Sequence, residues 1–252
     1  MSNGTLYKVL DSKRRPRNGG QGRYPDVGEW TPHLEPGRIV PCLYGYHLAP
    51  LPFIVRWLGP TIYAAEPCPD HEPVVQGRKV VTCAVRLTRQ TAWDARSARL
   101  FAADCAEAAM LGERALGREP DERLWDAVRV ARAFACGEAT DSQLDVAEAA
   151  AEDTSWDAGC DAGWDAAWVA AGVAARAAAS VNVWYAADAA VWAASVAAVK
   201  AAAKDVPEDA AKDAACVRFG ERLTAYLDGR DPGPVTALYG HEDGSEHGGG
   251  TQ

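Results

Sequence analysis

The chain has 252 residues, a formal net charge of −9 and seven cysteines. This length suits one large domain or two small ones, and neither half needs a disulfide to fold. The cysteines are odd in number and lie among apolar neighbours, which is typical of reduced thiols in a cytosol. Because the N-terminus lacks the basic-then-apolar order of a signal peptide and charges interrupt every apolar stretch, we predict a cytoplasmic protein with no membrane span.

Charge is distributed unevenly along the chain. Residues 1–60 carry eight Lys or Arg against four Asp or Glu, so the remaining residues hold a net charge near −13. The basic N-terminal segment and the acidic remainder of the chain could attract each other, or orient the molecule on a polyanion. The charge could also serve only to keep the protein in solution. All three interpretations stay open at this stage.

Residues 1–90 are predicted to form a strand-rich α+β domain. Strands are expected at 5–10, 38–43, 61–66 and 78–88, with a short helix at 51–58. The clearest strand is 78–88, in which Val81, Cys83, Val85 and Leu87 share one face. Two connections are predicted to be irregular loops: the Gly- and Arg-rich segment 11–28 and the proline-rich segment 67–73.

Residues 91–229 are predicted to form an Ala/Trp-rich all-α bundle. Helices are expected at 92–116, at 120–135, from Asp141 onward and at 205–229, with Gly117 and Gly137 ending the first two. Residues 147–204 are close to half alanine, and a helical hairpin is expected to turn near 180–183. Residues 230–252 have the composition of a disordered tail, in which we expect no function.

Tryptophans recur at four-residue spacing within 156–168, where Trp156, Trp164 and Trp168 alternate with aspartates. A four-residue step drifts about 40° around a helix at each repeat. The aromatic ridge therefore winds slowly, which favours crossing helices over a straight coiled coil.

Four residues of the N-terminal half are types that bind structural zinc: Cys42, His47, Cys68 and His71. Their spacing, C-x4-H and then C-x2-H, matches no standard zinc site. Cys42 and His47 also lie in apolar, strand-like sequence, where a cysteine is commonly a packing residue. We therefore assign no metal site and favour packing, with zinc left open.

A basic, Gly-rich loop follows the first predicted strand. Arg14, Arg15 and Arg17 could track phosphates of a nucleic acid by charge alone. Aromatic residues are sparse around them and the chain as a whole is acidic, which favours a solvated loop over nucleic-acid binding.

An acidic series could instead imitate a nucleic acid. Carboxylates recur at Asp141, Asp145, Asp153, Asp157, Asp161 and Asp165, four residues apart except at Ala149. Four helical residues rise about 6 Å, which is near the phosphate spacing of one strand. The series drifts about 240° around the helix, however, so a solvated face is the favoured interpretation.

Five short blocks occur in an order that resembles a known family. They are LYK (6–8), CLYGYHL (42–48), IYAAE (62–66), RKVV (78–81) and FAADCAE (101–107). The succession resembles a family of uncharacterised domains from bacteriophages and bacteria, known only as a domain of unknown function. The resemblance covers about the first 110 residues, and some members carry similar Ala- and Trp-rich helical extensions.

The same order also resembles the ADP-ribosyltransferase fold, in which comparable strands and a short helix surround bound NAD. That resemblance implies that Tyr46 and His47 pack on nicotinamide, that Glu66 polarises a ribose hydroxyl, and that Lys8 takes a first-strand position normally held by Arg or His. Such chemistry needs a carboxylate beside an oxocarbenium-like centre and aromatic walls. Glu66 departs from the pattern, because it ends its strand beside Pro67 without a second acidic partner.

The preferred interpretation is an accessory binding protein encoded by a phage or bacterium. Its N-terminal cleft would bind a small ligand such as a nucleotide, or a macromolecular partner, through Lys8, Tyr46 and Tyr63. The first alternative is an ADP-ribosyltransferase-like enzyme with Glu66 and His47 as catalytic residues. The second is a structural or nucleic-acid-mimic protein acting through its acidic helices. A small molecule or protein is favoured over nucleic acid as partner, and the sequence indicates neither a cofactor nor an oligomeric state.

Overall fold

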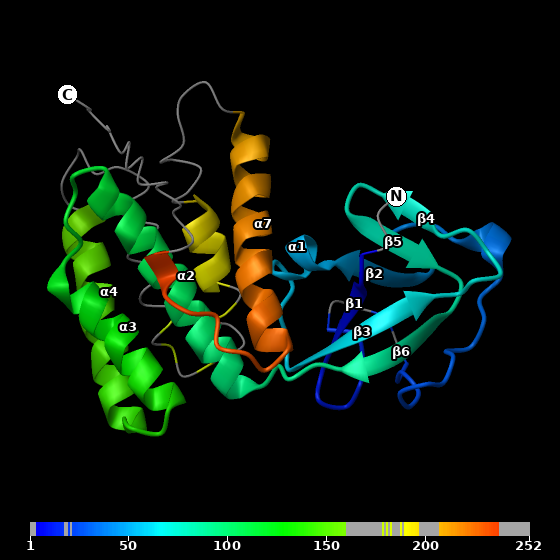
Figure 1. Cartoon of the computed structure of the whole chain (residues 1–252), viewed down its shortest axis with the longest axis horizontal. Coiled ribbons are helices and arrows are strands. Elements are labelled where there is room, and N and C mark those ends of the chain that lie inside the picture. Colours follow the sequence, from blue (N-terminus) through cyan, green and yellow to red (C-terminus); the bar gives the residue numbers. More distant parts are fainter. Residues whose placement is uncertain are drawn as a thin grey trace, which may run out of the picture.

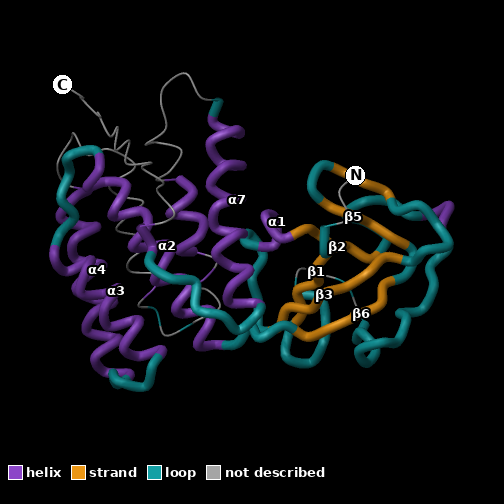
Figure 2. The backbone as a smooth tube through the Cα atoms, viewed as in Figure 1, coloured by secondary structure: helices purple, strands orange, loops and turns teal. Residues whose placement is uncertain are grey.

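A computed structural model describes residues 4–17, 20, 22–159, 178, 180, 182, 187, 189–196 and 207–236. These residues form a mixed α+β structure with a sheet at one end and helices at the other (Figures 1 and 2). Within the described residues, no helix combines the length and apolar character that a membrane crossing requires.

The sheet has six strands, and every neighbouring pair is antiparallel. The strands are β1 (Leu6–Leu10), β2 (Tyr46–Pro50), β3 (Thr61–Pro67), β4 (Val74–Gln76), β5 (Lys79–Thr82) and β6 (Val85–Gln90). Their order across the sheet is β4-β5-β2-β1-β3-β6. The first strand of the chain therefore lies inside the sheet, between β2 and β3.

Two of the predicted strands and the short helix are present near their expected positions. β1 and β3 fall within or beside the predicted ranges, and α1 (Leu51–Ile54) begins where the short helix was expected. The strand predicted at 38–43 is wrong: the 3-10 helix η1 (Pro36–Arg38) and a turn occupy this region, in which Cys42 has a φ of 67°. Pro41, inside the predicted range, has no backbone N–H to donate to a neighbouring strand, and the next strand is β2, which begins at Tyr46.

The strand predicted at 78–88 is split into β5 and β6 by a break at Cys83 and Ala84. Both residues are buried, as are Thr82 and Val85 on either side of them. The carbonyl of Cys83 accepts a hydrogen bond from the N–H of Leu34, and that of Ala84 accepts one from Cys68. The backbone carbonyls at the break thus bond to segments other than the neighbouring strand. The alternating sequence pattern did not reveal that both faces of the strand are covered here.

Each face of the sheet has its own core. On one face Tyr7, Ile62 and Ala64 pack against α1 and against residues of the helical half, including Trp93 and Phe101. On the other face, a cluster forms around Leu10, Tyr24, Leu48, Tyr63 and Leu87. The loop 11–28, predicted as irregular, delivers Tyr24 to this second core and so covers part of the sheet.

The helical half begins at α2 (Ala95–Ala115) and continues with α3 (Glu122–Ala135), α4 (Asp141–Gly159) and α7 (Glu208–Leu227). The Asp94 side chain accepts a hydrogen bond from the N–H of Ser97 at 2.7 Å and so caps α2. Gly117 and Gly137 follow α2 and α3 with φ values of 78° and 77°, as expected for helix-ending glycines. The predicted helices at these positions are therefore confirmed. Of the hairpin turn predicted at 180–183, Ser180 and Asn182 are described and the other two residues are not, so the turn itself stays a prediction. The side chains of the predicted ridge, Trp156, Trp164 and Trp168, lie outside those described.

The chain beyond α7 differs from the prediction of a disordered tail at 230–252. Residues 230–236 lie against the helices, and Val235 is 4% exposed in the same core as Phe101. The prediction is therefore wrong for this segment, because Val235 supplies an apolar anchor within an otherwise polar composition.

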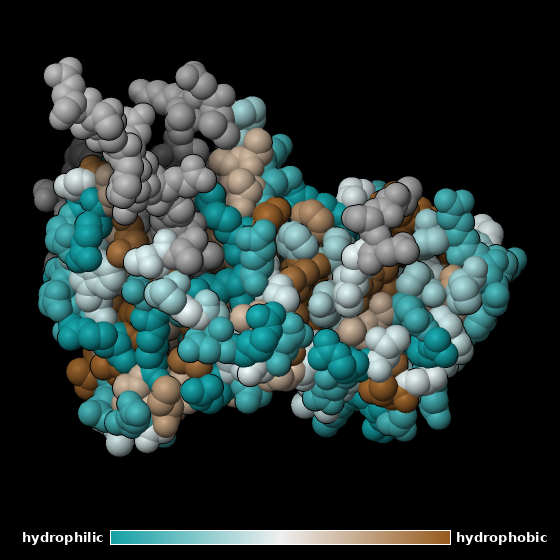
Figure 3. All heavy atoms as spheres, in the orientation of Figure 1, coloured by the Kyte–Doolittle hydropathy of each residue, from teal (hydrophilic) through white to brown (hydrophobic). Residues whose placement is uncertain are grey.

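On the face shown in Figure 3, hydrophilic residues predominate and hydrophobic ones form separate patches over both halves of the molecule.

The two halves are joined where α7 crosses α1 (Figure 1). At Gly220 of α7, an added Cβ would lie 3.0 Å from the Cα of Pro52 and 3.3 Å from its nitrogen. These are backbone atoms, so they cannot rotate away as a side chain would. The approach of the helices therefore requires glycine at this position. Arg78, in the turn between β4 and β5, adds an ion pair to Asp213 of α7 across the same junction.

Replacing Gly220 with valine is expected to lower the free energy of unfolding by about 1–3 kcal/mol, because overpacking forces the two backbones apart. Urea denaturation followed by circular dichroism measures the change. The matched control is Ala214→Val, which places the same β-branched residue at an exposed position of α7. Valine has a higher helix propensity than glycine, so helix propensity alone would not destabilise Gly220→Val. A Gly220→Val protein at least as stable as the wild type would therefore contradict the close contact with Pro52.

Candidate functional site

The sheet opens between its two central strands. β1 and β2 are paired only at Leu6 with Pro50 and at Tyr7 with Ala49. Beyond Tyr7, β1 continues to pair with β3 as far as Leu10, whereas β2 continues to pair with β5 as far as Tyr46. A cavity of about 670 Å³ lies at this opening and is lined by residues of both strands, including Lys8, Val9 and His47.

The cavity lining is basic and aromatic. Its cationic residues are Lys8, Arg17, Arg23 and Lys79. Its aromatic residues are Tyr7, Tyr24, Tyr44, Tyr46 and Trp57. Among the described residues that line it, none is an aspartate or glutamate, although the chain as a whole carries a net charge of −9. The cavity is therefore a local region of positive potential.

Lys8 occupies the opening itself. Its Nζ donates a hydrogen bond to the carbonyl oxygen of His47 at 2.9 Å and so bridges the two separated strands. The same ammonium lies 5.1 Å from the centre of the Tyr24 ring. Burial lowers the pKa of Lys8 to about 8, because desolvation disfavours the charged form. An anion entering the cavity would compensate this cost.

The aromatic wall is held in place by hydrogen bonds and ring contacts. The Tyr46 hydroxyl donates to the carbonyl oxygen of Pro32 at 3.0 Å, and its ring meets that of Tyr24 edge to face, with centroids 5.8 Å apart. Burial raises the pKa of Tyr24, so this phenol stays neutral. On the β5 side, Lys79 lies 5.2 Å from the centre of the Trp57 ring. Each wall thus pairs a ring with a cation.

His47 is a neutral acceptor rather than a cation. Its Nε2 accepts a hydrogen bond from the backbone N–H of Cys42 at 2.9 Å, which requires that this nitrogen carry no proton. Burial, with the nearby charges of Lys8 and Lys79, lowers the pKa of His47. The imidazole therefore fixes the turn at Cys42 and holds the rim of the cavity.

Gly45 allows this rim to approach β5 closely. Its φ is 141°, and an added Cβ would lie 2.5 Å from Cγ1 of Val81. Leu43, two residues before it, is 84% exposed and gives the cavity an apolar lip. The glycine and the turn before it thus bring Tyr44 and Tyr46 to the same opening.

Of the five residues predicted to bind a ligand or act in catalysis, three meet in this cavity and two do not. Lys8, Tyr46 and His47 line it. Tyr63 is directly opposite Lys8 in the pairing of β1 with β3, but its buried hydroxyl points to Gln90, with an O–O distance of 3.3 Å. Glu66 forms an ion pair with Arg86 of β6. β3 lies on the other side of β1 from the opening, so neither of its residues reaches the cavity.

The three arginines predicted to contact nucleic acid do not act as a group. Arg14 is paired with Asp26, and Arg15 is paired with Asp11 at 3.0 Å. Local carboxylates thus neutralise these two side chains, whereas Arg17 lines the cavity. In the acidic series, Asp141, Asp145 and Asp153 are exposed on α4, and the side chains of the other members lie outside those described.

The structure also divides the four residues considered for zinc. Cys42 and His47 contact each other at the rim of the cavity. Cys68 is buried at the far end of β3, beside Cys83, and His71 is exposed in the following loop. The four residues therefore do not share a site.

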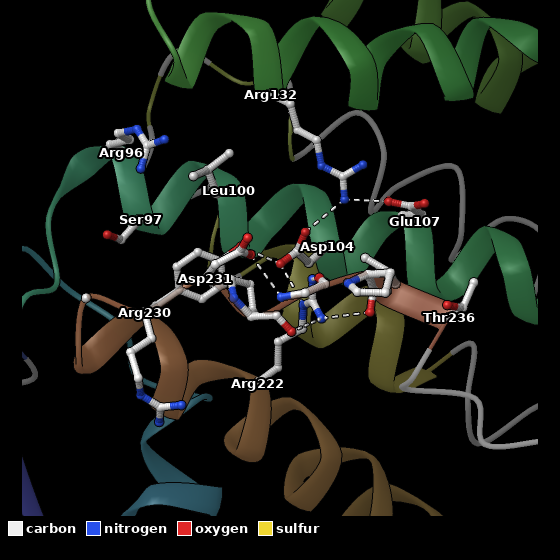
Figure 4. A pocket seen from close by; sticks show the side chains of 16 residues that line it. Arg96, Ser97, Leu100, Asp104, Glu107, Arg132, Arg222, Arg230, Asp231 and Thr236 are labelled. Atoms are coloured by element: carbon white, nitrogen blue, oxygen red, sulfur yellow. Dashed lines mark hydrogen bonds and ion pairs between the residues drawn. The ribbon is translucent and has the colours of Figure 1, made fainter.

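A second cavity, of about 720 Å³, lies among the helices (Figure 4). Several of its charged side chains form a network around Asp104. Asp104 of α2 accepts from Arg132 of α3 at 2.8 Å, from Arg222 of α7 at 2.6 Å, and from the Tyr226 hydroxyl. Arg222 also donates to the Gly233 carbonyl at 2.7 Å. This network joins three helices to the C-terminal segment and explains the order of residues 230–236.

Sequence reasoning missed several residues of the first cavity, namely Tyr24, Trp57, Lys79 and Arg23. Lys79 was assigned to a strand and Trp57 to a short helix, but nothing in their local patterns indicated a shared cavity. Arg23 and Tyr24 lie in the predicted loop 11–28, and the neighbouring basic and aromatic residues there were the one available signal.

Comparisons with known proteins find no family model, no curated protein and no solved structure that matches the chain.

Proposed function

We propose that the cavity between β1 and β2 binds a small anionic ligand with an aromatic ring, and that the ligand is a nucleotide. The observation that carries this proposal is the composition of the lining, which combines four Lys or Arg side chains with five aromatic ones and contains no carboxylate among its described residues. The volume of about 670 Å³ lies within the range of about 300–1,000 Å³ that is usual for small-ligand pockets.

The two chemical parts of a nucleotide match the two parts of the lining. Lys8 and Lys79 supply charged donors for phosphate oxygens, and such charge-assisted hydrogen bonds are stronger than neutral ones. Tyr44, Tyr46 and Trp57 offer faces or edges for a base, and stacking of a base on an aromatic side chain contributes about 1–3 kcal/mol. A ligand with both parts should therefore bind better than either part alone.

The proposal is one of binding rather than of NAD cleavage. Breaking a nicotinamide–ribose bond needs a carboxylate close to the developing positive charge. Glu66 is ion-paired with Arg86 on the opposite side of β1, and the described cavity lining supplies no other carboxylate. NAD is nevertheless included among the test ligands, since it carries both a base and phosphates.

Isothermal titration calorimetry at fixed ionic strength tests the proposal with ATP, NAD, adenosine and inorganic phosphate. ATP or NAD is expected to bind at least about tenfold more tightly than adenosine or phosphate, a difference of about 1.4 kcal/mol. A single-stranded oligonucleotide serves as the comparison for a nucleic-acid partner. Absence of binding by both ATP and NAD, or an oligonucleotide affinity that exceeds theirs, would contradict the assignment.

A further inference from the structure

A cluster of potential metal ligands lies away from the nucleotide cavity, where three separate segments of the chain meet. Cys68 directly follows β3, Cys83 lies at the break between β5 and β6, and His33 belongs to the loop before η1. One ligand atom from each of these residues lies within 4.8 Å of the other two. Among the residues that the structure describes, this is the one such group of three or more.

The backbone holds these segments in register. The N–H of Leu34 donates to the carbonyl of Cys83 at 2.8 Å, and the N–H of Cys68 donates to the carbonyl of Ala84 at 2.9 Å. The N–H of Thr31 also donates to the carbonyl of Val85 at 2.9 Å. The ligand positions are therefore built on paired backbone, so little ordering remains to be done when an ion binds.

The site is closed on the inside and open on one side. Cys68 and Cys83 are each 2% exposed, and Trp30, Leu34 and Ile39 pack around them. His33 is exposed, and its ring meets that of Trp30 edge to face at 6.4 Å. An ion could therefore enter from the His33 side and be sheltered by apolar groups on the other.

The donor set has the chemistry that zinc prefers. Two thiolates and an imidazole are typical zinc ligands, with Zn–S distances of about 2.3 Å and Zn–N distances of about 2.0 Å. Asp70 places a carboxylate oxygen 3.9 Å from Sγ of Cys68 and is a candidate for the fourth position. The two cysteine sulfurs lie on buried backbone and hold their positions. The side chains of His33 and Asp70 are exposed, so they can rotate to bring their ligand atoms to the ion.

We propose that His33, Cys68 and Cys83 bind a zinc ion, with Asp70 or a water molecule as the fourth ligand. Binding replaces the protons of the two thiols, so one Zn²⁺ enters and two H⁺ leave, while the neutral imidazole donates a lone pair. The ion thereby ties the loop before η1 to the edge of the sheet. This set shares only Cys68 with the four residues that the sequence had indicated.

Zinc affinity is expected to depend on pH. A thiol must lose its proton to bind the ion, so protons compete with zinc for both sulfurs. The affinity should therefore fall as the pH is lowered.

Metal content and cobalt spectroscopy of the full chain test the site. The reduced protein is incubated with zinc, dialysed and analysed by mass spectrometry for bound metal. We expect one zinc per chain in the wild type, and thiolate-to-cobalt charge-transfer absorption when cobalt replaces it. Loss of an outer-shell partner alone costs about 10–100-fold in metal affinity, so Cys83→Ser and His33→Ala are each expected to weaken zinc binding by at least about 100-fold.

Matched controls separate this site from adventitious binding. Cys42→Ser removes an exposed thiol beside another histidine, and His71→Ala removes an exposed imidazole close to Cys68 in sequence. Both should retain one zinc. His33→Ala keeps the test decisive if a cysteine variant fails to fold, because His33 is exposed. Absence of zinc in the wild type, zinc retained in His33→Ala, or a Cys68–Cys83 disulfide in the protein purified without reductant would each overturn the proposal.

Discussion

Replacing Asp104 with alanine is expected to lower the free energy of unfolding by about 3–5 kcal/mol, because it leaves a buried cation without its partner. Asp104 and Arg222 are 3% and 7% exposed, and the carboxylate accepts from Arg132, Arg222 and Tyr226. Guanidinium denaturation followed by circular dichroism measures the loss. The segment 230–236 should also become accessible to proteases, because Arg222 holds its carbonyl groups.

The control is Asp126→Ala, which removes a carboxylate from an exposed ion pair with Arg129 of the same helix. Exposed pairs contribute about 0–1 kcal/mol, so this change should be small. A loss below about 1 kcal/mol for Asp104→Ala would show that the network in Figure 4 contributes no more than a surface pair.

Replacing Lys8 with methionine is expected to weaken nucleotide binding by about 10- to 150-fold. Hydrogen bonds to charged groups contribute about 1.5–3 kcal/mol, and every 1.4 kcal/mol changes affinity tenfold. Methionine keeps much of the aliphatic length of lysine and removes the ammonium that faces the opening. Calorimetry with the nucleotide that binds the wild type measures the effect.

Lys13→Met provides the matched control for this variant. Lys13 is exposed in the loop that follows β1 and does not line the cavity, yet its loss changes the net charge by the same amount. Nucleotide affinity should change less than about twofold, because exposed charges are strongly screened by salt. If both variants lost a similar amount of nucleotide affinity, Lys8 would act only through the net charge of the protein, and the proposed direct contact would be wrong.

Local patterns predicted the elements that are determined locally. Gly117 and Gly137 marked helix ends because a left-handed glycine depends on a few neighbouring residues. The start of the first helix was placed at residue 92, and its cap, Asp94, was not identified. The strand predicted at 38–43 was wrong: the segment contains Pro41, which has no backbone N–H to donate, and it forms a turn with one isolated bridge between Val40 and Tyr44. The break between β5 and β6 depends on hydrogen bonds from Leu34 and Cys68, which lie far away in sequence.

Only part of the candidate site could be predicted, because the site depends on how distant strands pair. Lys8, Tyr46 and His47 were singled out from short blocks that resemble known domains, and the antiparallel pairing of β1 with β2 brings them together. Glu66 was expected beside them, but it lies three residues beyond Tyr63 on β3. Three strand residues span about 10 Å, and β1 also stands between β3 and the opening. The side of β1 on which the sheet opens could not be read from the pattern.

The central claim is that the partly buried ammonium of Lys8 receives the anionic part of a nucleotide. Its most direct test is an NMR titration of the lysine side chains with and without the nucleotide, in which Lys8→Met identifies the Lys8 signal. In the free protein the pKa of Lys8 is expected at about 8, and a bound phosphate should raise it, so affinity should fall as the pH rises above that value. A Lys8 pKa that stays the same when nucleotide is added to saturation would contradict the claim.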